Sequence, residues 1–302
     1  MRQTEERYIS LLTDFGFKRI FGSDINKDLL IDFLNSLFNG EQVVKNVTYL
    51  NSEHVGDVYA ERKAIFDVYC ENEHGEKFIV EMQNAYQTYF KDRSLYYATF
   101  PIREQAPKGD NWNFKLQHVY VVALLNNDMN EEAFSHESIN HDVGLLDKQT
   151  HKVFNNKLTF KYVEIARFNK DINELETNFD KWLYVLRNLS RLDNQPTYLR
   201  NEVFNRLFSQ AEIARFDKKE LKAYEDSLKA YRDIKNSLDT AKEEGRAEGR
   251  AEGLAKGRAE GASEKALTIA RELLAMNMSI DNIKKVTGLT DDEIHNLSNT
   301  SL

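Results

Sequence analysis

The chain has 302 residues, of which 41% are hydrophobic and 11% aromatic, and this apolar mass excludes a generally disordered protein. Three prolines and 13 glycines exclude collagen-like and proline-rich architectures, and a single cysteine excludes an internal disulfide framework or a cysteine zinc cluster. The formal net charge of -8 excludes a strongly basic nucleic-acid binder, although a local basic face remains compatible with it.

The first hundred residues predict a helix, three strands and a second helix. Apolar residues recur at helical spacing over 14–39, and the pair Asn39-Gly40 is a helix-ending signal. β-branched and alternating residues then predict strands over 42–50, 65–70 and 77–83. Gly75 lies between the last two strands and supplies a flexible turn, so these strands form a hairpin. A tyrosine-rich helix is predicted over 86–106.

The middle of the chain completes a mixed α/β pattern. Residues 116–125 are almost continuously apolar, which predicts a strand buried on both faces. The polar stretch 126–157 predicts long loops, and KYVEIARF after it predicts one more strand. Residues 172–192 and 198–232 are mostly helical in pattern. This order predicts an α/β fold with a mixed α+β sheet, in which helices pack around the sheet.

The C-terminal part has a different pattern. Glycine recurs every four residues from Gly245 to Gly261, and each glycine inside a helix costs about 1 kcal/mol relative to alanine. The segment 241–261 is therefore either a flexible linker or a helix whose small-residue stripe supports self-association. Residues 262–302 predict a small helical module that resembles a helix-turn-helix. Its four basic and six acidic residues favour an interaction module over a DNA reader.

Three local signals shape this C-terminal module. Ser279 can cap a helix, and Gly288 can end one. Thr290 and Glu293 have the spacing of a capping box at the start of another helix.

Two acidic residues of the predicted hairpin carry the chemistry. If the hairpin is centred near His74, Asp67 lies opposite Glu81, with Cβ atoms about 4.5–5.5 Å apart. Two carboxylates at that distance repel each other, so one takes up a proton or a cation lies between them. Mg²⁺ prefers one or two carboxylates and keeps positions open for water and phosphate. The alternative is that both are ordinary solvent-facing strand residues.

The segment Asp67…Glu81-Met82-Gln83 resembles the PD-(D/E)XK nuclease superfamily. More closely, the chain resembles the PD-(D/E)XK nuclease family transposases, also called recombination-promoting or Rpn family nucleases. The resemblance covers nearly the whole chain. It rests on TDFGFKRIFG, FDVYCENEHGEKFIVEMQ, DRSLYYA, the glycine repeat and TGLTDDEI, in this order. It implies a restriction-endonuclease-like core followed by an all-helical C-terminal tail.

The resemblance also implies roles for individual residues. Asp67 and Glu81 would bind Mg²⁺ or Mn²⁺, and Gln83 would stand in place of the lysine of the superfamily, positioning water or phosphate. Lys18 would supply the missing cation from the first helix. Asp14 would be a third metal ligand, unless it only caps the helix or pairs with Lys18 at i,i+4. Two residues would contact DNA if they do not merely pack the helix: Arg93 and Tyr97.

The function that follows is a metal-dependent DNA endonuclease that hydrolyses phosphodiester bonds in recombination or mobile elements. One alternative is a non-catalytic nuclease-fold protein that binds DNA or protein and self-assembles through its C-terminal segment, and another is an assembly scaffold without nucleic acid. The expected domains are a nuclease-like domain, a connecting helix, a glycine-periodic segment and a helical module, over 1–210, 211–240, 241–261 and 262–302. We expect a homo-oligomer through residues 241–302.

We also expect a cytoplasmic protein with no membrane partner. A lone cysteine fits a reducing compartment. The polar N-terminal stretch lacks the apolar segment of a secretory signal, and no run of about 18 apolar residues occurs.

Overall fold

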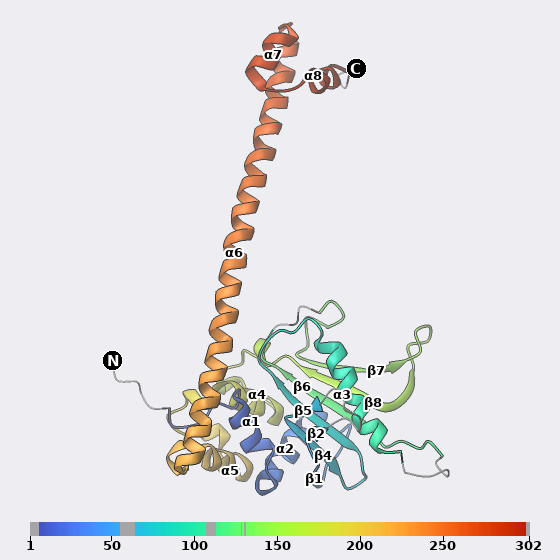
Figure 1. Cartoon of the computed structure of the whole chain (residues 1–302), viewed down its shortest axis with the longest axis vertical. Helices are drawn as coiled ribbons and strands as arrows, with labels where there is room; N and C mark the ends of the chain where they lie inside the picture. Colours follow the sequence, from blue (N-terminus) through green and yellow to red (C-terminus); the bar gives the residue numbers. More distant parts are fainter. Residues whose placement is uncertain (1–5, 55–63, 107–112, 128, 130, 300–302) are drawn as a thin grey trace. The chain divides into compact units, whose positions relative to one another are not determined.

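The computed structural model describes residues 6–54, 64–106, 113–127, 129 and 131–299. The chain separates into two compact units, one ending at Lys235 and one beginning at Asn236, and a single long helix runs from the first unit into the second. Figure 1 shows the α/β architecture of the first unit and the all-helical second unit. No helix in the described ranges combines the length and the apolar composition needed to span a membrane.

A mixed six-stranded sheet forms the centre of the first unit. In spatial order its strands are β1 (Val47–Tyr49), β4 (Val68–Asn72), β5 (Lys77–Gln83), β6 (Val119–Leu125), β8 (Val153–Val163) and β7 (Asn140–Leu146). β5, β6 and β8 run parallel, and the other neighbours pair antiparallel. A separate two-stranded ribbon consists of β2 (Glu53–His54) and β3 (Ala64–Ile65). This mixed sheet confirms the predicted α/β class.

Helices cover both faces of the sheet (Figure 1). One face packs against α1 (Asp14–Phe21), α2 (Lys27–Phe38), α4 (Asn178–Asn188) and α5 (Glu202–Ala211). The other face packs against α3 (Phe90–Glu104). Side chains of β6 alternate between the two cores: Val122 contributes to the first and Val121 to the second. The central strand is thus buried on both faces, as its continuous apolar sequence predicts.

The β4–β5 hairpin has the predicted register. Its turn is held by the side chain of Asn72, whose Oδ1 accepts the backbone N–H groups of His74 and Glu76 at 3.0 Å each. Gly75 has φ +74°, a left-handed conformation that glycine adopts without a steric penalty. Val68 pairs with Val80, so the next residues along the two chains are Asp67 and Glu81. The turn therefore places the two acidic residues opposite each other.

The N-terminal helix predicted over 14–39 is interrupted. α1 ends at Phe21, a 3-10 turn covers Asp24–Asn26, and α2 follows. The N–H of Gly22 closes α1 on the carbonyl of Lys18 at 2.8 Å. Asn26 then donates its side-chain amide to the carbonyl of Arg19 at 2.9 Å. These polar contacts satisfy backbone groups at the end of α1. The spacing of apolar residues, on which the prediction of one helix rested, gives no sign of such contacts. The stop at Asn39-Gly40 is present, with φ of 45° and 90°.

The prediction of long loops over 126–157 is wrong. This stretch contains β7 and the beginning of β8, which pair as an antiparallel ribbon. Apolar residues of the ribbon are exposed, namely Val143, Leu145, Leu146, Val153 and Phe154. The pairing register also shifts on both sides of Leu145. A strand that is not buried on one regular face does not need the apolar alternation on which the prediction depended. The last predicted strand ends at Val163, before a 3-10 turn over Ile165–Arg167.

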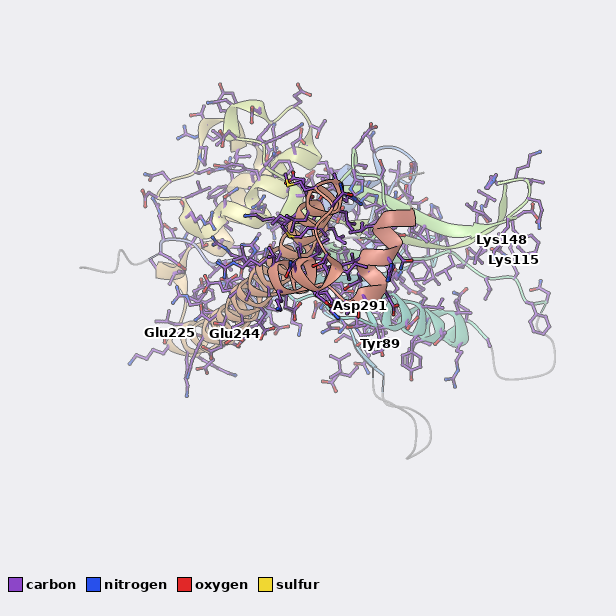
Figure 2. The ribbon with its side chains drawn as sticks, turned by 90° about the horizontal axis from the view of Figure 1, so that it is seen from above. Tyr89, Lys115, Lys148, Glu225, Glu244 and Asp291 are labelled. Carbon is purple, nitrogen blue, oxygen red and sulfur yellow. The ribbon has the colours of Figure 1, made fainter. Side chains whose placement is uncertain are left out.

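The glycine-periodic segment is helical. Helix α6 (Lys218–Ala275) runs through all five glycines of the repeat, and a Cβ added to any of them would meet nothing within 4 Å. Charged side chains project from this helix along its length, and Figure 2 labels Glu225 and Glu244 among them. The repeat therefore continues the helix and leaves the surface over its glycines open.

The second unit ends in a small three-helix core. It is formed by the last turns of α6 with α7 (Ile280–Thr287) and α8 (Asp291–Asn299), around Ala270, Ile283, Leu289, Ile294 and Leu297. Ser279 precedes α7, and Gly288 follows it with φ +72°. The Thr290 N–H donates to Glu293 Oε2 at 2.7 Å, and the Glu293 N–H donates to Thr290 Oγ1 at 3.4 Å. The predicted capping box is therefore present.

Gly16 lies where the backbone of the preceding turn comes very close. A Cβ at this position would lie 2.1 Å from the carbonyl oxygen of Ser10 and 2.9 Å from Thr13 Oγ1. We expect Gly16→Ala to lower the free energy of unfolding by about 1–3 kcal/mol, because the backbone has to move to relieve the overlap. Urea denaturation measures the change. Gly144→Ala is the control, because its Cβ would meet the nearest atom at an ordinary 3.8 Å; equal stability of both variants would contradict the prediction.

Candidate active site

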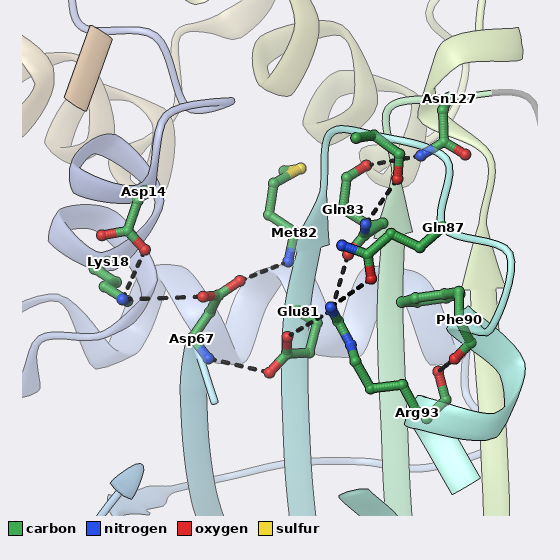
Figure 3. Close-up of polar contacts among 12 residues, drawn as sticks. Asp14, Lys18, Asp67, Glu81, Met82, Gln83, Gln87, Phe90, Arg93 and Asn127 are labelled. Atoms are coloured by element: carbon green, nitrogen blue, oxygen red, sulfur yellow. Dashed lines mark hydrogen bonds and ion pairs between the residues drawn. The ribbon is translucent and has the colours of Figure 1, made fainter. Parts of the chain in front are cut away.

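The carboxylates of Asp67 and Glu81 are each fixed by a hydrogen bond from a backbone N–H of the other segment (Figure 3). Asp67 lies in the bend between β3 and β4, and Glu81 lies on β5. The backbone N–H of Asp67 donates to Glu81 Oε1 at 3.1 Å, and the N–H of Met82 donates to Asp67 Oδ2 at 2.9 Å. Each carboxylate thus uses one oxygen to accept an N–H from the neighbouring chain segment. The second oxygen of each remains available for another partner.

Burial makes this pair of acids electrostatically costly. Glu81 is only 7% exposed, and burial together with the nearby charge of Asp67 raises the pKa of Glu81 to about 8. Burial also raises the pKa of Asp67, although the N–H of Met82 and the ammonium of Lys18 oppose this shift. Both shifts favour a proton held by the pair at neutral pH. A divalent cation between the two would remove both the repulsion and the need for that proton.

Lys18 lies beside the pair and is bound to Asp14. The two residues are one turn apart on α1, and Lys18 Nζ is 2.6 Å from Asp14 Oδ1 and 3.9 Å from Asp67 Oδ1. Burial lowers the pKa of Lys18, but its hydrogen bond to Asp14 and the surrounding carboxylates outweigh this and leave the pKa raised. Asp14 itself is exposed, with 63% of its side-chain surface accessible. It contacts the site through Lys18.

Arg93 approaches the pair from the other side. Its guanidinium comes from α3, and Nη2 is 3.8 Å from Glu81 Oε2. The same nitrogen donates to Gln83 Oε1 at 2.9 Å, and Nη1 donates to Gln87 Oε1 at 2.6 Å. The amide nitrogen of Gln83 donates to the carbonyl of Ala85 at 2.7 Å. These hydrogen bonds orient Gln83 toward Arg93. The positive charge beside Glu81 is that of the Arg93 guanidinium, which comes from α3.

Tyr97 packs behind this guanidinium. Its ring centroid is 5.4 Å from the Arg93 guanidinium carbon and 5.1 Å from the ring of Phe66, which it meets edge-on. Burial raises the pKa of Tyr97, so its hydroxyl stays protonated at neutral pH. The structure thus brings together Lys18, Asp67, Glu81, Gln83 and Arg93, with Tyr97 supporting Arg93 and Asp14 supporting Lys18.

Sequence reasoning missed three polar neighbours of the site. Gln87 binds Arg93 from the loop before α3. Asn127, which follows β6, donates its side-chain amide to the carbonyl of Gln83 at 3.2 Å, and the N–H of Asn126 donates to the same carbonyl at 2.8 Å. The signal for the asparagines was visible: a polar pair directly follows a fully buried strand, at the edge where side chains from parallel strands gather.

The donor set fits a hard divalent cation. The carboxylate oxygens that accept no backbone N–H are Asp67 Oδ1, 3.9 Å from Lys18 Nζ, and Glu81 Oε2, 3.8 Å from Arg93 Nη2. Carboxylate oxygens are the ligands that Mg²⁺ and Mn²⁺ prefer, and Mg²⁺ commonly uses one or two of them with water and phosphate. In the described part of the chain no group of three or more His, Cys, Asp and Glu side chains gathers around a point. Asp67 and Glu81 are thus the two carboxylates that the contacts of the hairpin bring together.

Two family models match the chain. The family described as "PD-(D/E)XK nuclease family transposase" matches residues 11–241. The family described as "Rpn/YhgA-like nuclease family, C-terminal HTH domain" matches residues 263–299. No curated protein and no solved structure matches the chain.

Proposed function

The chain belongs to the PD-(D/E)XK nuclease family transposases, and from this membership we propose that it is a metal-dependent DNA endonuclease acting in recombination or mobile elements. The observation that carries the proposal is the buried pair Asp67 and Glu81. The pair is locked by two backbone hydrogen bonds, and burial raises the pKa of both acids. Perturbed carboxylates of this kind are typical of catalytic sites. The single buried Cys70 fits a cytoplasmic location.

In this proposal Asp67 and Glu81 bind Mg²⁺ or Mn²⁺. The ion, when bound, would polarise the scissile phosphate and favour deprotonation of water. Lys18 and Arg93 flank the carboxylates and attract the phosphate oxygens of DNA. Gln83 acts through Arg93, whose guanidinium it orients. Water adds to phosphorus, the P–O ester bond breaks, and the leaving oxygen takes up a proton, so no covalent intermediate with the protein forms.

The C-terminal module has a part in the proposal. Residues 263–299 match a helix-turn-helix domain, which favours DNA contact by this module. The acidic balance of 262–302 favoured an interaction module over a DNA reader, and the family match favours DNA contact instead. We propose that this module brings the chain to DNA while the carboxylate site performs the cleavage.

One observation favours a second candidate function. Where the superfamily has a lysine, Gln83 is neutral, and its amide is bound to Ala85 and Arg93. A protein that had lost cleavage but kept DNA binding would also retain this arrangement. The alternative function is therefore a non-catalytic nuclease-fold protein that binds DNA and self-assembles through its C-terminal segment.

A plasmid assay separates the two functions. Supercoiled plasmid is incubated with the full-length protein in Mg²⁺, Mn²⁺, Ca²⁺ or EDTA, and the products are resolved on an agarose gel. The proposal expects nicked or linear DNA in Mg²⁺ or Mn²⁺ and intact plasmid in EDTA. Intact plasmid under every condition, together with retarded DNA on a gel shift, would instead establish the binding protein.

We further propose that the chain forms a homo-oligomer through residues 241–302, with the glycine stripe of α6 as the contact. The double variant Gly249→Leu/Gly253→Leu tests this. A Cβ added at either position meets nothing within 4 Å, and leucine favours a helix more than glycine by close to 1 kcal/mol per site. We expect a more stable helix but a smaller species in sedimentation equilibrium. Glu248→Gln/Glu252→Gln is the control; unchanged mass for the leucine variant would contradict the proposal.

A further inference from the structure

A surface hollow adjoins the carboxylate site at the beginning of α3. It has a volume of about 610 Å³, and its lining consists of Gln87, Thr88, Tyr89, Asp92, Arg93 and Tyr96. This volume lies within the range of about 300–1,000 Å³ that is usual for small-molecule sites. Tyr89, labelled in Figure 2, is 74% exposed, and Tyr96 is 42% exposed. The hollow therefore presents aromatic surface to an incoming ligand.

Arg93 belongs to both the hollow and the carboxylate site. One side of its guanidinium reaches Glu81 and Gln83, and Nη1 binds Gln87, which also lines the hollow (Figure 3). Arg93 thus links the hollow to the acidic pair. If a phosphate of the DNA contacts Arg93, the sugar and base of that nucleotide lie within reach of either the hollow or the carboxylate site.

We propose that this hollow binds an unpaired nucleobase of the DNA next to the phosphate that is cut. The inference rests on the proposed nuclease function and adds the class of substrate. A nucleobase matches the lining because it has flat π faces for Tyr89 and Tyr96 and polar edges for Thr88 and Gln87. Asp92 also decides between ligands: its carboxylate accepts from the amino groups of bases but repels a phosphate.

The proposal narrows the substrate to DNA that contains unpaired nucleotides. In a regular duplex the faces of each base are covered by its neighbours, so a base can reach Tyr89 only after it leaves the stack. That step costs least where the base is already mismatched, bulged or single-stranded. Single strands, bulges and duplex ends are therefore the preferred substrates, and intact duplex is the poorer one.

A binding experiment tests this without relying on cleavage. The probes are a duplex with a single bulged 2-aminopurine and the fully paired duplex of the same sequence, titrated with full-length protein in EDTA. Anisotropy of an end label gives the affinity, and quenching of 2-aminopurine reports stacking of the base. The variants are Tyr89→Ala and Tyr89→Phe. Tyr86→Ala is the matched control, since Tyr86 is a 54% exposed tyrosine of the same loop that does not line the hollow.

We expect the wild type to prefer the bulged probe and to quench its fluorescence. Tyr89→Ala should weaken binding of that probe by about 5- to 100-fold and leave the paired duplex unchanged, whereas Tyr89→Phe and Tyr86→Ala behave as wild type. Equal affinity of the wild type for both probes would overturn the inference, as would an equal loss on both probes in Tyr89→Ala. If the preference is present but plasmid stays intact in Mg²⁺, the hollow stands and the nuclease activity falls.

Discussion

Replacing Asp67 with asparagine should abolish Mg²⁺-dependent cleavage, with a loss on the order of 10³-fold or more. Loss of a single preorganised electrostatic group from an active site has a comparable effect. The asparagine keeps the shape of the side chain and can still accept the N–H of Met82 through its oxygen. The hairpin therefore stays intact, and what the variant loses is the negative charge that the cation needs. Initial rates of plasmid nicking measure the effect.

The same variant should be more stable than the wild type in EDTA, on the order of 1 kcal/mol. Asp67 is a desolvated acid next to Glu81, and replacing a buried charge with a neutral group of equal size removes both the desolvation cost and the repulsion. Urea denaturation with EDTA present measures this gain. Loss of an acid with a structural role lowers both the cleavage activity and the free energy of unfolding. A variant that is inactive but more stable therefore identifies an acid with a functional role.

Glu71→Gln is the matched control for Asp67→Asn. Glu71 lies on the same hairpin, at the end away from Asp67, where it forms an ion pair with Lys77. Its replacement should leave cleavage within a factor of two or so of wild type, since it removes one partly buried ion pair that does not contact Asp67 or Glu81. Full activity of Asp67→Asn, or an equal loss in both variants, would show that Asp67 does not bind the catalytic cation.

The second large effect concerns pH. Because the pKa of Glu81 is raised to about 8, most metal-free molecules carry a proton on Glu81 at pH 6. A cation has to displace that proton, so at subsaturating Mg²⁺ cleavage should rise about tenfold per pH unit between pH 6 and 8 and then level off. The total gain is about 100-fold. Rates measured at constant ionic strength across this range check it.

Stability of the metal-free protein should change in the opposite direction. The pKa of Glu81 is higher in the folded state than in the unfolded chain, where it is near 4.5. The folded state therefore binds the proton more tightly, and this contribution to stability is full below pH 4.5 and is lost as pH rises towards 8. Glu81→Gln should remove the loss, and saturating Mg²⁺ should offset it. Metal affinity that is independent of pH between 6 and 8 would contradict both expectations.

The acidic pair was predictable because it depends on local rules. Strand alternation and the centre of a short turn together determine which residues lie opposite each other, and both are visible in the sequence around Gly75. The contact between Asp14 and Lys18 likewise follows from their i,i+4 spacing on a helix. The α/β class followed from the order of apolar runs. Each of these inferences requires no knowledge of how distant elements pack.

The arrangement around Arg93 depends on packing and could not be predicted in the same way. The Arg93 side chain meets Glu81 and Gln83 only because α3 packs across the face of the sheet. The position of Arg93 beside the two acids and its hydrogen bond from Nη2 to Gln83 Oε1 both follow from that tertiary contact. The β7–β8 ribbon was missed for a related reason, since its apolar side chains are exposed and give no regular burial pattern.

The turn at Asn72 and Gly75 has a consequence for how this protein tolerates genetic change. The acids are held by the backbone of the hairpin, so their placement is determined by the number of residues between them. A substitution in the turn leaves that number unchanged. Gain or loss of one codon between Asn72 and Glu76 would turn one acid to the opposite face of the sheet. Selection for cleavage would therefore tolerate substitutions in the turn at positions other than Asn72 and Gly75, but only one turn length.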